Sequence, residues 1–368
     1  MGSSIGFAVI GCGVIGSTHV QAIDSIEKAH LAVLCSCPPD RARELAEQYG
    51  AAWCSDFQEA IAHPDVDAVS VCTPSGFHAQ PALAALEAGK HVLVEKPMEI
   101  TLDKADQMIE AADRARCCLG VVFQLRFRPV MQYVKAAVDA GKLGRITLGE
   151  ASVKCYRSPD YFRAAEWRGT WALDGGGALM NQGIHFVDLL LWLMGPVQSV
   201  TAYADTLLHS IEVEDTLVAS MRFDNGALGV IEATTTAFPH LSDRLEIVGT
   251  QGSIRIENGQ LCFKYLADED GTDVGLYGLH SDQGWRAAEA ATLTGEGGHR
   301  AQIADFVSAV REGRPPAVDG QEGRRSLALV TAIYESTRTG RKVSIVKARD
   351  GGCRHAGQTL ALHSNSPN

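Results

Sequence analysis

Short apolar segments alternate with amphipathic segments along the first third of the chain. The apolar segments, which predict buried β-strands, lie at Ile5–Ile10, Leu31–Cys35, Ala68–Cys72, His91–Val94 and Leu119–Phe123. Hydrophobic positions with helical spacing lie between them and predict helices at Arg41–Tyr49, Gln80–Glu87 and Leu102–Ala115. Nearly continuous apolar strands separated by helices are typical of a parallel sheet that is covered on both faces. This part of the chain therefore predicts a doubly wound α/β fold of the Rossmann type.

The pattern of hydrophobic positions changes after residue 123. A helix is predicted at Pro129–Ala140, and strand-like segments dominate after it. The predicted strands are Ser199–Asp205, Thr216–Phe223, Ala227–Thr235, Arg244–Val248 and Ser253–Glu257, and two late helices are predicted at Gln302–Arg311 and Arg325–Thr337. Asn225-Gly226 joins two of the strands and is a strong hairpin signal. We therefore predict a second, α+β domain with a large, mostly antiparallel open sheet.

The chain of 368 residues is longer than a single core usually supports, so we divide it where the pattern changes. The prediction is a Rossmann dinucleotide-binding domain at 1–123 and an α+β domain at 124–347. Residues 348–368 are polar and rich in Gly, Ser and Asn, which predicts a disordered tail. Asp268–Gly298, rich in Gly, Asp and Glu, is predicted to form a surface excursion.

Charge and cysteine content narrow the partners and the compartment. The 44 acidic and 33 basic residues give a formal net charge of −11, which argues against nucleic acid or an anionic membrane as the main partner. The ten cysteines are scattered and lack Cys-x-x-Cys spacing, so we predict free, mostly buried thiols and no metal site. The sequence has neither an 18-residue apolar run nor a signal-peptide pattern, and we predict a cytoplasmic protein that does not span a membrane.

The glycine pattern after the first predicted strand indicates a dinucleotide site. Gly11, Gly13 and Gly16 form a Gly-x-Gly-x-x-Gly motif, with Val14 and Ile15 between the last two. The first glycine permits a tight turn, the second lets a diphosphate approach the backbone, and the third allows close helix packing. The diphosphate then lies at the N-terminus of the following helix, where free N–H groups and the helix dipole favour an anion. The motif therefore predicts bound NAD or NADP.

The end of the second predicted strand bears on the choice between these cofactors. Twenty residues past Gly16, where an acidic residue would hydrogen-bond the ribose 2′-hydroxyl of NAD, the chain has Ser36, and Arg41 follows shortly after. Serine and arginine can hydrogen-bond a 2′-phosphate, whereas a carboxylate would repel it. An alternative is that Arg41 is simply a solvated helix residue. We favour NADP slightly over NAD.

Polar residues follow two further strands at their carboxyl ends, which is where this fold binds ligands. Thr73, Pro74, Ser75 and His78 come after the strand Ala68–Cys72. Glu95, Lys96 and Pro97 come after the strand His91–Val94. A lysine at this position can present its amino group to the oxygen of a bound substrate. We expect Lys96 to do so.

A second motif lies in the predicted α+β domain. Gly175–Gly177 precedes Asn181 and His185, and an apolar helix follows them. Asn181, His185 and Asp188 are spaced i, i+4, i+7, so one helical face can carry all three. The glycine run indicates that another group approaches the backbone closely. The alternative is that His185 is an ordinary core histidine.

These motifs together resemble the Gfo/Idh/MocA family of oxidoreductases, over nearly the whole chain from about Ile5 to Val346. The resemblance implies a Rossmann domain followed by an α/β substrate-binding domain whose open sheet mediates homodimers or homotetramers. It also implies an NAD(P)-dependent dehydrogenase that oxidises a secondary hydroxyl of a sugar, sugar derivative or inositol-like polyol. The segments Trp167–Trp171 and Gly175–His185 are similar to those of members that act on sugar 3-hydroxyls, such as UDP-N-acetylglucosaminuronate 3-dehydrogenase.

By this resemblance Lys96 and His185 are catalytic, with Asn181 beside them. Many members have Asp where this chain has Asn181, and an amide does not stabilise an imidazolium as a carboxylate does. Either His185 or Lys96 is therefore the general base, the lysine with a pKa lowered by burial. The Lys96–Pro97 peptide bond is a candidate for the cis form.

The resemblance also assigns residues to the ligands. The residues expected to bind the cofactor are Gly11, Gly13, Val14, Ile15, Gly16, Ser36, Arg41, Thr73, Pro74, Ser75, His78, Glu95, Lys96, Gln124, Trp167 and Arg168. The residues expected to bind the substrate are Lys96, Arg126, Tyr156, Arg157, Asn181 and His185, with Tyr161, His299 and Gln302 as further candidates.

The negative net charge describes the average surface, whereas the segments expected around the site are basic. Their basic residues are Lys96, Arg126, Arg128, Lys154, Arg157, Arg163 and Arg168. Such a cleft can bind a dinucleotide and an acidic or phosphorylated sugar. Two alternatives stay open: a same-family enzyme with a non-carbohydrate substrate, as in the biliverdin reductase and dihydrodiol dehydrogenase members, and a non-catalytic nicotinamide sensor.

Overall fold

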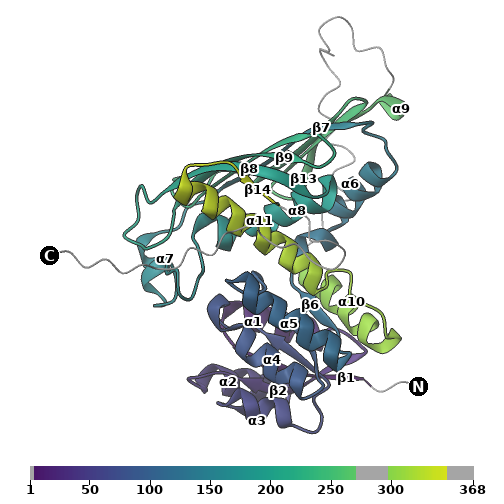
Figure 1. The fold of residues 1–368 in the computed structure, drawn as a ribbon. Helices are drawn as coiled ribbons and strands as arrows, with labels where there is room; N and C mark the ends of the chain where they lie inside the picture. The colour runs from purple at the N-terminus through teal and green to yellow at the C-terminus, as the bar shows by residue number, and fades with distance from the viewer. Residues whose placement is uncertain (1–3, 271–296, 346–368) are drawn as a thin grey trace, which may run out of the picture.

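The computed structural model describes residues 4–270 and 297–345 and contains two sheets, one above the other in Figure 1. Asp268–Gly298 and the tail at 348–368 therefore lie largely or wholly outside the described residues. The first part of the chain consists of β1 (Ile5–Ile10), α1 (Val14–Asp24), β2 (Ala29–Cys35), α2 (Asp40–Tyr49), β3 (Ala52–Cys54), α3 (Phe57–Ala62), β4 (Ala68–Val71), η1 (Ser75–Phe77), α4 (Ala79–Glu87), β5 (His91–Val94), α5 (Leu102–Ala115) and β6 (Leu119–Val121).

The remaining elements form the second sheet and the helices around it. They are η2 (Gln124–Phe127), α6 (Pro129–Asp139), β7 (Ile146–Lys154), α7 (Pro159–Arg163), η3 (Ala178–Gly183), α8 (Ile184–Met194), β8 (Val197–Asp205), β9 (Thr216–Phe223), β10 (Leu228–Thr234), β11 (Arg244–Gly249), β12 (Gly252–Glu257), β13 (Gln260–Leu266), α9 (Ala267–Asp270), α10 (Gly298–Glu312), α11 (Gly320–Thr339) and β14 (Val343–Ser344).

The first sheet has the order β3-β2-β1-β4-β5-β6, and its strands pair in parallel. The strand order reverses between β1 and β4, so the crevice that binds ligands in such sheets opens at their carboxyl ends. The inner strands are buried along their whole length because helices cover both faces. The predicted doubly wound fold is confirmed. The strand β3 escaped prediction because three residues are too few to show a pattern.

The second sheet has eight strands in the order β13-β12-β11-β7-β10-β9-β8-β14. The pair β7–β10 is parallel and the other pairs are antiparallel, which confirms the predicted mostly antiparallel sheet. In β9, buried residues alternate with exposed ones, so one face of the sheet is covered and the other is open. The strands β7, β13 and β14 were not predicted. Gly149 and Glu150 interrupt the apolar pattern of β7, and β14 has two residues.

The two late helices return to the first sheet. Ile303, Phe306 and Val307 of α10 belong to the same apolar cluster as β1, and the rings of Phe306 and Phe7 lie 6.3 Å apart. The long helix α11 packs against α5 and β6 on one side and against α8 and β8 on the other (Figure 1). The sequence boundary at residue 124 placed α10 in the second domain, whereas its apolar stripe covers the first sheet.

The described cysteines are free thiols, as predicted, although Cys37 is exposed and Cys117, Cys118 and Cys262 are only partly covered. Within residues 4–270 and 297–345, no helix is both long and apolar enough to cross a membrane.

Candidate active site

One cavity, here called the first cavity, lies at the carboxyl ends of the first sheet. Its volume is about 970 Å³, and it extends from the glycine turn after β1 to the start of α8. Of the residues expected to bind the cofactor, the cavity is lined by Gly11, Gly13, Val14, Ile15, Ser36, Arg41, Thr73, Pro74, Ser75, His78, Glu95, Lys96, Gln124, Trp167 and Arg168. The fold thus brings together residues that are up to 157 positions apart, from Gly11 to Arg168.

Each glycine of the turn has a separate steric role. Gly11 has φ +98°, and a Cβ there would lie 2.5 Å from the Cys72 carbonyl oxygen. A Cβ on Gly16 would lie 1.9 Å from the Gly11 carbonyl oxygen, so this glycine brings α1 onto the turn rather than lining the cavity. At Gly13 no described atom lies within 4 Å of the added Cβ, which would project into the cavity. This is the space that a diphosphate needs next to the backbone.

Unpartnered polar atoms indicate that the cavity is built for a ligand. Among the described residues, the buried Thr73 Oγ1, Gln124 Oε1 and His185 Nδ1 have no hydrogen-bond partner, and all three residues line this cavity. No described side chain caps α1, and its first turn has no acidic residue, so its N–H groups stay available for an anion. Buried polar groups without partners are costly unless a ligand or water pairs with them. The residues present therefore fit a dinucleotide.

Glu95 lines this cavity and belongs to a cluster of buried polar side chains. His19 Nε2 lies 3.0 Å from Glu95 Oε1, and His19 Nδ1 lies 2.7 Å from Ser70 Oγ. Although burial favours a protonated Glu95, the hydrogen bond and charge of His19 lower the pKa of Glu95 to about 2. His299 lies 3.9 Å from the same oxygen. His19, Glu95 and His299 are therefore spaced closely enough to hold a metal ion. Because hydrogen bonds already engage both nitrogens of His19, ordinary pairing accounts for this cluster.

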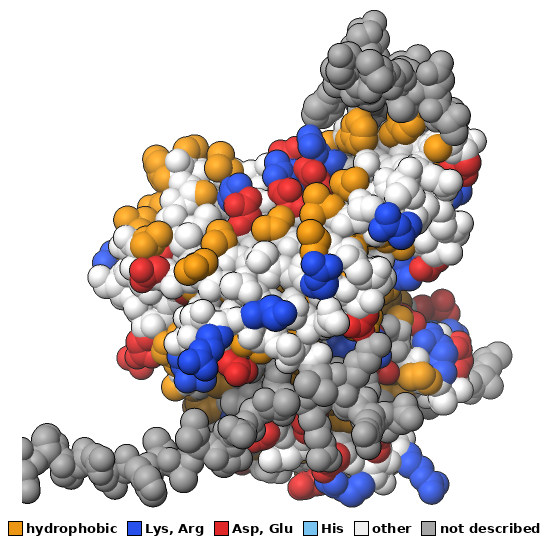
Figure 2. Space-filling model, turned by 45° about the horizontal axis from the view of Figure 1, so that its top comes forward, with side chains coloured by type: hydrophobic (Ala, Val, Ile, Leu, Met, Phe, Trp, Pro, Cys, Tyr) orange, Lys and Arg blue, Asp and Glu red, His pale blue; other side chains and the backbone are white. Residues whose placement is uncertain are grey.

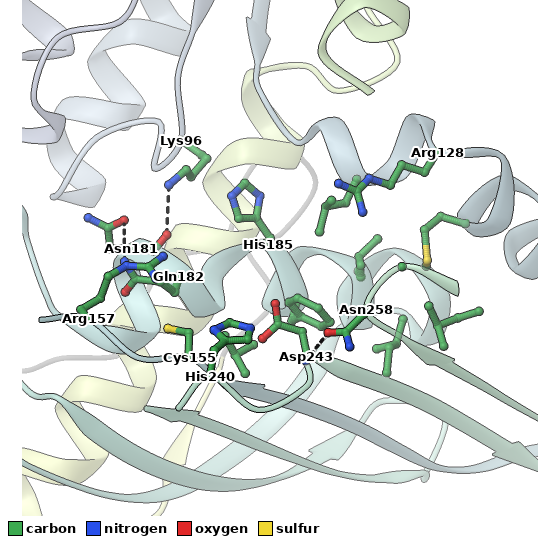
Figure 3. A pocket seen from close by; sticks show the side chains of 18 of the residues that line it. Lys96, Arg128, Cys155, Arg157, Asn181, Gln182, His185, His240, Asp243 and Asn258 are labelled. Carbon is green, nitrogen blue, oxygen red and sulfur yellow. Dashed lines mark hydrogen bonds between the residues drawn. The ribbon is translucent and has the colours of Figure 1, made fainter. Parts of the chain in front are cut away.

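The second cavity has a volume of about 440 Å³ and lies between α8 and the second sheet (Figure 3). It is lined by Lys96, Leu125, Arg128, Met131, Val153, Cys155, Arg157, Tyr161, Asn181, Gln182, His185, Phe186, Leu189, His240, Asp243, Leu245, Ile256, Asn258 and Gly259. Lys96, Asn181 and His185 also line the first cavity, so these three residues mark where the two cavities meet.

At this junction Lys96 reaches across from the first sheet to the helix that carries His185. The Lys96 Nζ donates a hydrogen bond of 3.0 Å to the main-chain oxygen of Asn181, and the Lys96–Pro97 peptide bond is cis, as predicted. Burial lowers the pKa of Lys96, while the charges of Glu95 and Asp174 oppose this shift. A lysine with a lowered pKa gives up its proton more readily than a solvated lysine and can then accept one. The junction can therefore hold a reacting oxygen and take up its proton.

His185 is neutral at this junction. Burial and the nearby charge of Lys96 lower the pKa of His185 to about 3. Its ring lies edge-on to the ring of Phe123, with 6.2 Å between the centroids. A neutral imidazole with a low pKa can donate or accept a hydrogen bond but takes up a proton poorly.

The predicted helical face of Asn181, His185 and Asp188 forms only in part. The residues Ala178–Gly183 form one turn of π-helix, and α8 begins at Ile184. Asn181 and His185 line both cavities, whereas Asp188 is buried and binds Arg126, with its oxygens 2.6 and 2.7 Å from the guanidinium. Asp188 therefore lies against a buried arginine and does not line either cavity.

Arg126 and Tyr156, both expected to contact the substrate, lie elsewhere. Arg126 is 4% exposed and binds Asp188 and Glu322, so it joins η2 to α8 and α11. Tyr156 pairs with Thr236 and stacks edge-on against Phe238, whereas its neighbours Cys155 and Arg157 line the second cavity. Extended backbone points successive side chains to opposite sides, which accounts for the second error.

The basic cleft is smaller than predicted. Lys154 binds Glu232, and Arg163 binds Asp160 on the surface. The basic residues that line the cavities are Lys96, Arg128, Arg157 and Arg168, with Arg41 at the far end of the first cavity.

Several lining residues were not predicted as ligand contacts. They are Gln182, His240, Asp243 and Asn258. Arg128, expected as one of the basic residues around the site, also lines this cavity. His240, Asp243 and Asn258 lie in turns beside strands of the second sheet, and nothing in their local sequence indicates a cavity. His299, a weaker candidate, lines the first cavity, whereas Gln302 hydrogen-bonds the backbone of Val121 and Phe123.

The parallel sheet, the open glycine turn and the lysine–histidine junction between two cavities define an oxidoreductase that uses a nicotinamide dinucleotide. Residues 5–123 match the model of the oxidoreductase family with an NAD-binding Rossmann fold, and residues 131–255 match the GFO/IDH/MocA C-terminal domain. The chain belongs to the Gfo/Idh/MocA family.

Its relatives include sugar and polyol dehydrogenases. Myo-inositol 2-dehydrogenase of Thermotoga maritima is 31% identical and covers 92% of this chain and 97% of its own. The WlbA dehydrogenase from Bordetella pertussis, solved with NADH and UDP-GlcNAcA, is 35% identical, with a TM-score of 0.84, and covers 94% of this chain and 99% of its own. A levoglucosan dehydrogenase solved with NADH and levoglucosan is 26% identical, with a TM-score of 0.82, and covers 93% of this chain and 99% of its own.

Proposed function

We propose that this protein is an NAD(P)-dependent dehydrogenase that oxidises a secondary hydroxyl of a sugar, sugar derivative or polyol, or reduces the corresponding ketone. The observation that carries this proposal is the meeting of the two cavities at Lys96, Asn181 and His185. A hydride acceptor in the first cavity and a hydroxyl-bearing carbon in the second are then neighbours at these residues. A non-catalytic sensor has no need of such a junction.

A nicotinamide dinucleotide held along Gly11, Gly13 and Thr73 in the first cavity would supply the hydride acceptor for this reaction. The proton of the substrate hydroxyl goes to Lys96, whose pKa is lowered by burial. The hydrogen bond from its Nζ to the Asn181 carbonyl orients the amine, so that its lone pair can face the second cavity. His185, held neutral, hydrogen-bonds the same substrate oxygen and fixes the direction of the hydroxyl.

The second cavity favours a polar, negatively charged substrate. The guanidinium of Arg157 lies over the ring of Tyr161 at 5.2 Å, and its buried Nε has no partner among the described residues. Arg128 lines another part of the same cavity, away from Arg157 in Figure 3, and lies close to Gly259. Two arginines in one cavity are suited to a carboxylate or phosphate. The relatives named for inositol, levoglucosan and UDP-GlcNAcA support a polyhydroxylated substrate over a non-carbohydrate one.

For the cofactor we propose that both dinucleotides bind, with a modest preference for NADP. Ser36 and Arg41 line the cavity where the ribose 2′ position is expected. Ser36 Oγ donates to the Pro38 carbonyl, and Arg41 binds Glu44. Both side chains therefore already have hydrogen-bond partners that compete with a 2′-phosphate. The nearby carboxylates of Asp40 and Glu44 weaken the attraction for that phosphate, which keeps the preference small.

The open face of the second sheet is the proposed interface between copies of this chain, in a homodimer or homotetramer. Its exposed side chains include Leu148, Tyr203, Val218 and Leu228 on four adjacent strands. Figure 2 shows apolar side chains over this face with basic and acidic ones between them. A face with both signs of charge and exposed apolar groups can pair with itself about a two-fold axis. Light scattering in solution measures the assembly directly.

A turnover screen tests the proposed function. Purified protein is mixed with NAD⁺ or NADP⁺ and a panel of neutral sugars, uronic acids, inositols and sugar nucleotides, and reduced nicotinamide is followed. We expect turnover with at least one of them and a loss of about 1,000-fold or more in kcat for Lys96→Met, because the proton acceptor is gone.

The control is Lys28→Met, because Lys28 lies on the surface beside Glu27, and it should keep full turnover. Dinucleotide binding should be nearly unchanged in both variants. If Lys96→Met keeps its turnover, the assigned mechanism is wrong. If the whole panel is inert while dinucleotides bind, the sensor alternative gains.

A further inference from the structure

We propose that Asp174 is a positioning residue of the catalytic centre, which acts on Lys96 through Asn181. This inference rests on the proposed function. Asp174 is 3% exposed and lies behind Asn181, outside the lining of both cavities. It precedes the glycine run Gly175–Gly177, and sequence reasoning gave it no role.

The contacts of Asp174 form a chain that ends at the catalytic amine. Asn181 Nδ2 donates to Asp174 Oδ1 at 2.8 Å, and the Gly169 N–H donates to Asp174 Oδ2 at 2.9 Å. The main-chain oxygen of Asn181 in turn accepts the 3.0 Å hydrogen bond from Lys96 Nζ. Asp174 therefore fixes the side chain of the residue whose carbonyl orients the lysine.

Both oxygens of Asp174 accept hydrogen bonds, which is the pattern of an ionised carboxylate. Burial raises the pKa of Asp174, while the bonds from Gly169 and Asn181 and the charge of Lys96 oppose that shift. The side chain of Asn181 thus lies between the negative charge of Asp174 and the reacting atoms. It is also tied to Gln182, whose Nε2 donates to Asn181 Oδ1 at 3.2 Å. This arrangement gives the lysine a nearby counter-charge without placing a carboxylate against the substrate.

The ionisation of Lys96 depends on the groups that face it. Glu95 and Asp174 favour its charged form, whereas burial and the charge of Arg157 favour its neutral form. Removal of the Asp174 charge leaves Glu95 as the carboxylate acting on Lys96 and lowers the pKa of the lysine further. The acid limb of the kcat/KM profile in the oxidation direction should then move to lower pH.

The proposal is tested by exchanging the carboxylate of Asp174 and the amide of Asn181. We expect Asp174→Asn to lower kcat by about 10- to 100-fold with a smaller change in KM, because the lysine loses its orientation. Asn181→Asp should be more damaging, since it sets a second carboxylate against the buried carboxylate of Asp174 and removes the donated hydrogen bond. The double variant Asp174→Asn with Asn181→Asp restores one carboxylate and one amide and should recover most of the turnover.

The matched control is Asp160→Asn, an exposed aspartate paired with Arg163, which should leave kcat and the pH profile unchanged. Recovery in the double variant, together with a shifted acid limb in Asp174→Asn, supports the proposal. If Asn181→Asp is harmless, or if the double variant is no better than either single one, Asp174 merely holds the Gly169 turn and the proposal is overturned. Variants that bind dinucleotide as the wild type does are folded. Absence of turnover in the wild type would instead count against the proposed function.

Discussion

The two cavities that meet at Lys96 are built from different parts of the chain. The first is shaped by backbone: a glycine turn, the N-terminus of α1 and the carboxyl ends of parallel strands. The second is shaped by side chains that come from η2, the segment after β7, the π-turn, the loop before β11 and the turn after β12. Substitutions alter backbone groups only indirectly, whereas each side chain of the second cavity can be replaced on its own.

The two cavities therefore differ in how much they indicate about the reaction partner of the cofactor. A dinucleotide binds to features that any Rossmann turn supplies, so the first cavity tells little about the reaction partner. Arg128, Arg157, His240 and Asp243 line the second cavity, and we expect these side chains to influence which substrate binds there. Substitutions at the glycine turn should therefore weaken dinucleotide binding, and substitutions in the second cavity should change substrate preference.

The largest effect is expected from Gly16→Ala. Its Cβ would lie 1.9 Å from the Gly11 carbonyl oxygen, so α1 or the turn must move, at a cost of about 1–3 kcal/mol in the free energy of unfolding. We expect dinucleotide affinity to fall about 100-fold or more, measured by calorimetry, because the diphosphate site is displaced.

Gly13→Ala provides the contrast within the same turn. No described atom meets its Cβ, so the thermal unfolding midpoint should stay near that of the wild type while dinucleotide affinity falls. Equal losses of stability in both variants would contradict the separate steric roles assigned to these glycines.

A smaller and selective effect is expected from Arg128→Gln. Loss of the guanidinium should raise KM for anionic substrates about 10- to 100-fold, with little change in kcat, because an anion loses a charge-assisted hydrogen bond. Arg163→Gln, on the surface beside Asp160, serves as the control and should leave KM unchanged. Equal effects of Arg128→Gln on neutral and anionic sugars would show that this arginine does not select charge.

The smallest effect is expected at the edge of the first cavity, where a side chain rather than backbone faces the cofactor. Ser36→Asp should shift the ratio of the NADP and NAD dissociation constants by about tenfold towards NAD, because a carboxylate repels a 2′-phosphate. Ser36→Asn, of similar size and uncharged, should shift the ratio much less. An unchanged ratio in Ser36→Asp would show that this position does not contact the ribose.

The same difference explains how far sequence alone could go. The residues of the first cavity follow strands or a glycine motif, so local pattern was enough to find Gly11–Gly16, Thr73 and Lys96. Arg157 and His185 were found through the motifs around them. The turn of π-helix at Ala178–Gly183, however, has no characteristic sequence pattern from which it could be predicted.

Contacts between segments that are distant in sequence could not be predicted from local sequence patterns. Arg126 was assigned to the substrate because it follows a strand end, and its burial against Asp188 and Glu322 depends on two helices distant in sequence. Asp243 and Asn258 reach the second cavity through the pairing of β11 and β12, which no single segment specifies. Sequence patterns therefore indicated several of the residues that line the cavities, but not the loop residues that bound the second cavity.

The central claim is that a hydride passes directly between the two cavities at the Lys96–His185 junction. Its most direct test uses a substrate found in the turnover screen, deuterated at the carbon that is oxidised. Stoichiometric enzyme is mixed with oxidised dinucleotide and this substrate, and the nicotinamide is analysed by mass spectrometry after a single turnover. We predict that the deuterium is found on the nicotinamide ring. Deuterium that is released to water, or that stays in the substrate while product forms, would contradict the account.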